Sequence, residues 1–414
     1  MQAALLTKYQ ANPKPIVITM VGLGFMGFGF FSANMQNHGI SIPLIITRRP
    51  SEAKSFLETK GLAIEITDSV EKIIQNSSSG ITSISDKLDL IRDFPSDVVF
   101  EVTGTVDYGT DVALRTVLAK KHLVTMNPEL QATVGTQLKK LFDSANLKIT
   151  DVLGDQPGSI ARLIASAKLK GFEPVMAGNM KRYMDHYATQ AKMQSWADDK
   201  GLAVRQTVSF TDGTKQSIEM TLVANYFGMS TLVDGMHGPE VANFDEVLQR
   251  FNWEDVPQQG VVDYVIGRNL FPGVFIVAKH TDPEQQKYLR YLNMGNGPYY
   301  VLFDSYHLCH LEVAETIGKL VHYDQPTINN GNNPTAMTIT IAKSDLPAGT
   351  VLDGIGGDYT YGSIRSLQTQ RNGCLPVGVS HGAILLRDVV KDQPILLSDV
   401  TVPNNHATRL LGLA

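Results

Sequence analysis

The first chemically informative feature of this sequence is a glycine-rich turn near its N-terminus. The segment GLGFMG has the GxGxxG spacing and directly follows the apolar run PIVITMV. Gly22 permits a tight turn, Gly24 lets the backbone approach a pyrophosphate, and Gly27 lets the following helix pack closely against the strand. Phe25 and Met26 open that helix, whose N-terminal amides and positive dipole end favour phosphate. The turn therefore predicts a dinucleotide-binding site.

The residues after the second predicted strand discriminate between NAD and NADP. An NAD enzyme usually places an acidic residue there, where it binds the ribose 2′-hydroxyl group. This sequence has Arg48 and Arg49 instead, and its first acidic residue is Glu52. Guanidinium groups bind a 2′-phosphate through paired hydrogen bonds, so the pattern favours NADP(H). The alternative is that both arginines are solvated surface residues.

Two further strand ends carry residues that could contact the cofactor. Thr103 and Gly104 follow the run DVVFEV, and Asn127 and Glu129 follow the run HLVTM. Dinucleotides lie along the carboxyl ends of the strands in this class of sheet, so we expect these positions to face the nicotinamide ribose. The alternative for them is a structural role in capping loops.

Two lysines are the best candidates for polarising a substrate carbonyl group and supplying a proton. Lys215 lies in the sequence DGTK, which predicts a turn after a strand, and Glu219 follows one helical turn later. Lys181 lies in the sequence GNMKRY. Ammonium groups can stabilise a developing oxyanion and donate a proton. Solvated surface lysines are the competing interpretation.

Three other polar residues are weaker catalytic candidates. Asp155 follows the fifth predicted strand and could orient a substrate hydroxyl group, bind a metal or cap the next helix. Asn225 could bind substrate or cap a helix. His237 lies in the turn GMHGPE, where an imidazole can act as an acid or a ligand, although a lone histidine is more often structural.

The sequence YHLCHLE contains residue types that can bind zinc, but we do not predict a zinc site there. His307 and His310 are three residues apart and would share one face of a helix, with Glu312 close behind. A catalytic zinc site needs a third well-placed ligand, and no HExxH motif is present. We therefore predict no metal ligand in this chain.

These residues must be positioned by a parallel α/β sheet. Apolar runs predict strands at 15–21, 40–47, 97–102, 122–126 and 147–153, with helices at 25–38, 106–120 and 132–146 between them. This alternation indicates a Rossmann-type doubly wound sheet.

Beyond residue 155 the pattern changes, which predicts three domains in all. We expect an NADP-binding Rossmann domain at 1–155 and an α+β catalytic domain at 156–330, with strands at 203–210 and 273–278. Residues 300–330 of it should pack back on the first domain. Residues 331–414 contain short apolar runs separated by glycines, starting with 336–342, which predicts a small, mostly β domain.

The composition excludes several classes of partner. The net charge of the 414 residues is −5 without a long basic run, which argues against nucleic acid and anionic membranes. The two cysteines lack CxxC spacing, so a disulfide scaffold is not expected. We see no signal peptide and no membrane-spanning run, so the expected location is the cytoplasm.

Taken in order, many segments resemble those of a known family. They include VGLGFMG, DVVFEVTG, KHLVTMNPELQATVG, GDQPGS, DGTKQSIEM, GMHGPE, AKSDLPAGTVLDGIGG and LPVGVSHG. The chain is similar to the deoxyxylulose-phosphate reductoisomerase-like oxidoreductases. Their domains are a homoserine-dehydrogenase-like NADP-binding domain, a central catalytic domain and a C-terminal SAF domain. The resemblance implies an NADPH-dependent reductase or reductoisomerase of a sugar-, polyol- or sugar-phosphate-like substrate, as a homodimer.

The chain departs from that family at two places. It has Asp155-Gln156 where those enzymes have an Asp-Glu pair, and GNMKRY where they have a sequence rich in lysine and asparagine. Reductoisomerases often use a divalent cation, so magnesium or manganese stays an open alternative, although no ligand spacing here supports one. Two alternatives stay open: a dehydrogenase of a small hydroxy compound, like homoserine dehydrogenase, and a non-catalytic NADP-binding sensor or assembly protein.

Overall fold

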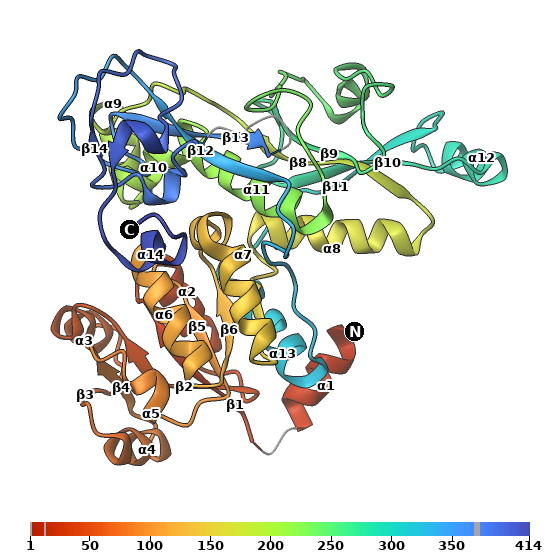
Figure 1. Cartoon of the computed structure of the whole chain (residues 1–414). Coiled ribbons are helices and arrows are strands. Elements are labelled where there is room, and N and C mark those ends of the chain that lie inside the picture. Colours follow the sequence, from red (N-terminus) through yellow and green to blue (C-terminus); the bar gives the residue numbers. More distant parts are fainter. Residues whose placement is uncertain (1, 12–13, 368–372) are drawn as a thin grey trace. The chain divides into compact units, whose positions relative to one another are not determined.

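The computed structural model describes residues 2–11, 14–367 and 373–414 of the chain (Figure 1). By their internal contacts these residues form two compact units. The first unit contains Met1–Leu130, Gln137–Asp155 and Leu308–Asn329, and the second contains Gln131–Thr136, Gln156–His307 and Asn330–Ala414. The expected three-domain division stays a prediction.

A seven-stranded sheet forms the centre of the first unit. Its order is β3-β4-β2-β1-β5-β6-β7, and every pairing is parallel. The strands are β1 (Ile16–Val21), β2 (Ile40–Ile46), β3 (Ile64–Ile66), β4 (Thr82–Ser85), β5 (Val98–Glu101), β6 (His122–Thr125) and β7 (Ile149–Asp151). The predicted doubly wound parallel α/β sheet is therefore confirmed, and it is extended by the short strands β3 and β4.

One helix precedes the first strand of this sheet, and others follow its strands along the chain. They are α1 (Gln2–Ala11), α2 (Phe25–Asn34), α3 (Pro50–Glu58), α4 (Val70–Ser78), α5 (Leu90–Asp93), α6 (Val106–Leu118) and α7 (Pro128–Ser144). Helix α2 is four residues shorter than predicted. Helix α7 begins four residues earlier than predicted, because Pro128 fits the first helical position and the Asn127 side chain caps the helix.

A late segment of the chain completes the core of the first unit. After a 3₁₀ turn at Cys309–Glu312, helix α13 (Val313–Tyr323) adds Val313, Ile317 and Leu320 to the apolar cluster that contains Phe30 and Phe100. Residues 308–329 belong to the first unit, whereas the strand Tyr299–Asp304 belongs to the second.

Lys121 gives the first unit a testable pH dependence. Its Nζ donates to the Ile91 carbonyl oxygen at 2.6 Å and to that of Phe94, and burial lowers its pKa from 10.5 to about 8. Between those pH values the unfolded chain binds a proton that the folded chain does not. The free energy of unfolding should therefore rise as the pH is raised from 8 to 10.5. In urea titrations at several pH values, Lys121→Met should lack this part of the rise. If the free energy of unfolding changes with pH equally in the variant and in the unaltered protein, the assignment is contradicted.

The second unit is built on a four-stranded sheet of order β11-β10-β8-β9. Its strands are β8 (Glu173–Lys181), β9 (Val261–Ile266), β10 (Val274–Lys279) and β11 (Tyr299–Asp304). Helices α8 (Gln156–Leu169) and α11 (Thr214–Phe227) pack along one face, as Figure 1 shows. The opposite face carries an apolar cluster that includes Met176, Met180, Val261 and Val265. The predicted strand at 273–278 is confirmed as β10.

The strand predicted at 203–210 is wrong, because these residues form helix α10 (Val204–Thr211). The sequence AVRQTVSF alternates as a strand does. However, Val204, Thr207, Val208 and Thr211 also fit the i, i+3, i+4, i+7 spacing of a helix. Of these four, Thr207, Val208 and Thr211 are buried in the second unit, so tertiary packing selects the helical period.

The remaining elements of the second unit are short. They are helices α9 (Gln190–Lys200), α12 (Pro283–Tyr291) and α14 (His406–Leu410), the 3₁₀ turns Phe244–Gln249, Val377–Val379 and Leu397–Asp399, and strands β12 (Ala336–Ala342), β13 (Thr360–Ser366), β14 (Ile384–Leu385) and β15 (Val400–Thr401). The apolar run at 336–342 forms β12, and the mostly β character of residues 331–414 as a separate domain stays a prediction. In the described residues, no helix combines the length and the apolar character that a membrane crossing requires.

Candidate functional site

The glycine turn of the first unit has the geometry that dinucleotide binding requires. Gly22 has φ +106°, and a Cβ there would lie 2.8 Å from the Val102 carbonyl oxygen. A Cβ on Gly27 would lie 2.7 Å from the Gly22 carbonyl oxygen. A Cβ on Gly24, in contrast, would meet no atom within 4 Å. Two glycines are therefore needed for packing, and the third leaves open space beside the backbone for a phosphate group.

Helix α2 begins directly at this open space. Its N-cap residue is Gly24, so no side chain caps the first amides. Phe25 is 64% exposed and Met26 is half-buried. Uncapped amides at a helix N-terminus form an anion-binding site. The turn and the start of α2 together fit the pyrophosphate of a nicotinamide dinucleotide.

The two arginines after β2 differ in their surroundings. The Arg49 guanidinium group forms an exposed ion pair with Glu52 at 2.9 Å. The Arg48 guanidinium group lies 5.5 Å from the centre of the Tyr108 ring. No carboxylate of the described chain pairs with Arg48, so its charge is the more readily available for a 2′-phosphate.

A buried carboxylate organises the loops after β5 and β6. Glu101 is fully buried and accepts hydrogen bonds from the Thr103 amide at 2.8 Å, the Thr125 hydroxyl at 2.6 Å and the Asn127 amide at 3.2 Å, as well as from the Thr103 hydroxyl. Burial raises the pKa of Glu101, and these hydrogen bonds oppose that rise. Sequence analysis did not select Glu101, although it is a charged residue at the end of an apolar strand.

Of the other candidate residues of the first unit, Asn127 belongs to this network. Asn127 is buried, accepts from the Leu130 amide at 3.1 Å and donates to the Thr105 carbonyl oxygen at 3.0 Å, so it caps α7 and braces the neighbouring loop. Gly104 has φ +66° and open space around it. Glu129 is half-buried in the first turn of α7. Asp155 is buried and directly precedes α8 in the chain.

In the second unit, three polar side chains from different elements meet on the face of the sheet that α8 and α11 cover. Asn179 of β8 donates its amide hydrogens to the Gln156 side-chain oxygen and to Glu219 Oε2, the latter at 3.2 Å. Gln156 lies at the start of α8 and Glu219 lies on α11. All three are buried, and the Gln156 amide nitrogen lies 3.3 Å from His307 Nε2. The Asn179 Oδ1 atom is buried and has no hydrogen-bond partner within the described chain.

Both candidate lysines belong to the elements that carry this polar cluster. Lys181 is two residues beyond Asn179 on β8, so the two side chains lie on the same face of the sheet. Lys215 is four residues before Glu219 on α11, so the two share a helix face. Lys215 does not follow a strand, as the sequence had predicted; it lies in the first turn of a helix that follows another helix.

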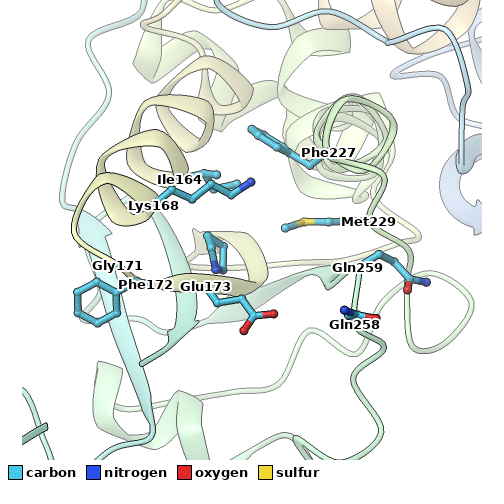
Figure 2. Close-up of a pocket in the computed structure, with 10 residues that line it drawn as sticks. Ile164, Lys168, Gly171, Phe172, Glu173, Phe227, Met229, Gln258 and Gln259 are labelled. Carbon is cyan, nitrogen blue, oxygen red and sulfur yellow. The ribbon is translucent and has the colours of Figure 1, made fainter. Parts of the chain in front are cut away.

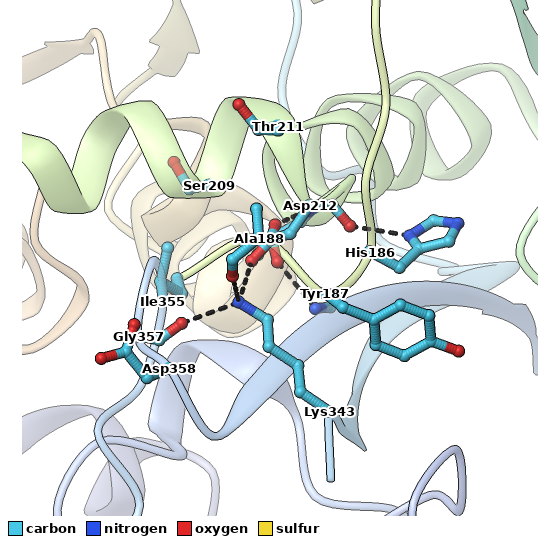
Figure 3. Close-up of polar contacts among 12 residues, drawn as sticks. His186, Tyr187, Ala188, Ser209, Thr211, Asp212, Lys343, Ile355, Gly357 and Asp358 are labelled. Carbon is cyan, nitrogen blue, oxygen red and sulfur yellow. Dashed lines mark hydrogen bonds and ion pairs between the residues drawn. The ribbon is translucent and has the colours of Figure 1, made fainter. Parts of the chain in front are cut away.

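A buried ion pair fixes the turn before Lys215. Figure 3 shows the Lys343 ammonium group bonded to Asp212 Oδ2 at 2.9 Å and to the carbonyl oxygens of Ala188 and Gly357, each at 2.7 Å. Asp212 also accepts from the Thr214 amide at 2.9 Å. This pair ties the start of α11 to residues of the C-terminal segment.

Two candidates lie apart from the polar cluster. His237 Nδ1 is 3.1 Å from Asp263 Oδ2. In the pairing of β8 with β9, Asp263 lies beside Gly178 and Tyr264 lies beside Asn179. Neighbouring residues of a strand point to opposite faces of the sheet. The Asp263 side chain is therefore on the opposite face of the sheet from that of Asn179. Asn225 accepts from the amides of residues 335 and 336, both at 2.8 Å, and donates to Asn330 at 2.9 Å, so its amide is occupied within the protein.

The histidines of the sequence YHLCHLE do not come together as metal ligands in the described part of the chain. The expected helical face shared by His307 and His310 is wrong: His307 precedes the 3₁₀ turn and belongs to the second unit, whereas His310 lies against Gly29 in the first. Glu312 ends that turn. Magnesium and manganese prefer several carboxylate oxygens, and the polar cluster offers Glu219 together with amides. No group of three or more His, Cys, Asp or Glu residues suited to a metal occurs within 2–11, 14–367 and 373–414.

Comparison with known proteins supports an oxidoreductase assignment for the central segment. Residues 154–313 match the family model "Oxidoreductase DRL, catalytic domain". The homoserine dehydrogenase of Lactococcus lactis subsp. lactis is 21% identical over 231 residues, which cover 52% of this chain and 51% of that protein. The chain thus spans about half the length of this curated relative. The match to the family model identifies the central segment as similar to an oxidoreductase catalytic domain.

Several solved structures are distantly similar. A probable dehydrogenase from Thermotoga maritima is 12% identical, with a TM-score of 0.41 and coverage of 75% of this chain and 90% of that one. A Bordetella pertussis dehydrogenase in complex with NADH and UDP-GlcNAcA is 11% identical, with a TM-score of 0.43 and coverage of 77% and 91%. The 1-deoxy-D-xylulose 5-phosphate reductoisomerase of Zymomonas mobilis, in complex with NADPH, is 11% identical, with a TM-score of 0.38 and coverage of 73% and 81%.

Proposed function

We propose that this protein is an NADP(H)-dependent oxidoreductase that interconverts a carbonyl and an alcohol group on a small, polar, sugar-like substrate. The observation that carries the proposal is the geometry of the glycine turn: a Cβ on Gly24 would meet no atom within 4 Å, and the first amides of α2 have no side-chain cap. The match of residues 154–313 to an oxidoreductase catalytic domain supports the redox chemistry.

The first unit supplies the groups that bind the cofactor. The glycine turn and the α2 amides hold the pyrophosphate, and Arg48 binds the 2′-phosphate. The loops braced by Glu101 hold the nicotinamide half of the molecule. The bound cofactor supplies a hydride, or accepts one in the reverse direction.

The second unit supplies the groups that bind the substrate. Lys215 stabilises the negative charge that develops on the carbonyl oxygen and donates the proton that makes it a hydroxyl group. Glu219, one helical turn away, orients that lysine. Lys181 holds a second oxygen of the substrate, and the unpartnered Asn179 Oδ1 accepts a hydrogen bond from a substrate hydroxyl group.

The cofactor preference is tested by titrating the protein with NADPH and NADH and following protein fluorescence. Arg48→Ala should weaken NADPH binding about 10- to 100-fold, because one charge-assisted contact to the 2′-phosphate is lost. Arg49→Ala should weaken it less, since Glu52 already pairs with that arginine. Tighter binding of NADH than of NADPH would overturn the preference.

The catalytic assignment is tested by following NADPH oxidation with a panel of carbonyl sugars and sugar phosphates. Lys215→Met should lower kcat by about 10²- to 10⁴-fold, the usual contribution of a general acid, and leave the Kd for NADPH unchanged. Lys200→Met, an exposed lysine at the end of α9, is the matched control. Turnover that is equal in both variants would remove Lys215 from the mechanism.

A second candidate function is a dehydrogenase of a small hydroxy compound. The similarity to a homoserine dehydrogenase over 231 residues favours it. Testing hydroxy amino acids and hydroxy acids with NADP⁺ separates this candidate from the first. If the protein binds NADPH and turns over neither class, the non-catalytic sensor becomes the better proposal.

A further inference from the structure

A second hollow lies in the second unit, away from the polar cluster. It is an open hollow with a volume of about 500 Å³, which is within the range of small-molecule sites. Its walls come from the carboxyl ends of α8 and α11, the start of β8 and the loop before β9 (Figure 2). No part of the proposed oxidoreductase mechanism uses it.

This hollow is separate from the cluster around Asn179. Gln156 is the first residue of α8, and Lys168 of the hollow lies in its last turn. Twelve residues of helix correspond to roughly 18 Å. The two places are therefore at opposite ends of the same helix.

Four polar side chains face the hollow without partners of their own. Lys168, Glu173, Gln258 and Gln259 line it; all four are exposed, and among the described residues no hydrogen bond or ion pair holds their side chains. Figure 2 shows the Lys168 nitrogen and the Glu173 carboxylate on different sides of the space, with the two glutamines on a third. The hollow thus offers one positive group, one negative group and amides that can donate or accept.

The backbone adds a preference for a positive charge. Helix α11 ends at Phe227, with Gly228 at φ +71° as its C-cap, and α8 ends at Leu169 shortly before Gly171 at φ +80°. Both helices therefore direct their carboxyl ends, which carry partial negative charge, toward the residues that form the hollow. Glu173 reinforces that preference.

Apolar side chains line the space between the charged groups. Ile164, Phe227 and Met229 form this wall, and Figure 2 shows Met229 between Phe227 and the two glutamines. A ligand with a short hydrocarbon part would bury it there. Its ammonium group would face Glu173, and its carboxylate would face Lys168.

We propose that this hollow is a second ligand site and that it binds an amino-acid-like zwitterion. The ammonium group binds Glu173 and the two helix ends, the carboxylate binds Lys168, and the side chain packs on Phe227 and Met229. The proposal does not depend on the oxidoreductase assignment.

The test uses the full-length protein without cofactor. Each of the proteinogenic L-amino acids is added at millimolar concentration, and the midpoint of thermal unfolding is measured; isothermal titration then gives a Kd for any that raises it. We expect at least one amino acid to bind saturably. Glu173→Gln and Lys168→Met should each weaken its binding at least 10-fold. Lys170→Met is the matched control, because Lys170 is an exposed lysine on the same helix end that bonds Ser166 and does not line the hollow.

The outcomes are distinct. If no amino acid binds saturably, or if binding is the same in Glu173→Gln and Lys168→Met as in the unaltered protein, the proposal is overturned. The NADPH titration in the same preparations reports on the oxidoreductase assignment independently. If the unaltered protein does not bind NADPH, the oxidoreductase assignment is contradicted and the zwitterion site is not.

Discussion

Replacing Gly24 with valine should abolish measurable NADPH binding and leave the fold intact. A Cβ at this position would meet no protein atom within 4 Å, so the folded protein has room for the new side chain. The same room is what the pyrophosphate needs in order to reach the amides of α2. We expect the Kd for NADPH to rise at least about 100-fold, the equivalent of about 3 kcal/mol. The midpoint of thermal unfolding should change by no more than a few degrees.

Substitutions of the neighbouring glycines Gly22 and Gly27 serve as comparison variants. Gly22→Ala would force a side chain into a backbone with φ +106° and to within 2.8 Å of the Val102 carbonyl oxygen. Gly27→Ala would bring a Cβ within 2.7 Å of the Gly22 carbonyl oxygen. Both variants should therefore lose stability as well as cofactor binding. If Gly24→Val binds NADPH as tightly as the unaltered protein, the turn does not hold the dinucleotide.

Replacing Lys343 with methionine should cost about 3–5 kcal/mol of the free energy of unfolding, because it leaves the buried Asp212 carboxylate without its partner. Burial already raises the pKa of Asp212, and without the ammonium group nothing of opposite charge opposes that rise. The carboxyl group would then take up a proton in the folded state at a higher pH than in the unfolded chain. The destabilisation, measured by urea unfolding, should therefore shrink as the pH is lowered toward the folded-state pKa of Asp212.

A double variant distinguishes the ion pair from simple loss of packing. Asp212→Asn combined with Lys343→Met removes both charges, so it should be more stable at neutral pH than Lys343→Met alone. The matched control is Lys287→Met, which breaks an exposed ion pair with Glu284 and should cost less than about 1 kcal/mol. If Lys343→Met and Lys287→Met lower the free energy of unfolding equally, the buried pair does not stabilise the protein as proposed.

Most of the first unit could be predicted from the sequence, because parallel strands buried on both faces appear as apolar runs. The strand at 16–21 reads IVITMV, and the glycine spacing after it has few other structural meanings. Strands β3 and β4 were not predicted, since the sequences IEI and TSIS are short and half polar. Helix α10 was missed because eight residues can satisfy both a period of two and a period of 3.6.

The candidate site could be predicted less completely, because its polar contacts join residues that are distant in the sequence. Glu101 bonds Thr125 and Asn127, which lie on the next strand and loop, and Asn179 bonds Glu219 forty positions later. Only strand register shows that Asp263 and Asn179 occupy opposite faces of a sheet. The lysines could be selected by type, but the helix that carries Lys215 could be placed only by the tertiary structure.

The late helix α13 bears on how the protein is made. Its residues Val313, Ile317 and Leu320 belong to the same apolar core as Leu5 and Tyr9, about 300 positions earlier in the sequence. On a ribosome the first 155 residues emerge long before α13 is synthesised, so the nascent nucleotide-binding unit exposes the apolar surface that α13 later covers. The first unit is therefore completed only when residues 308–329 have been synthesised, after most of the second unit's central segment, and a chaperone would be needed most during this interval.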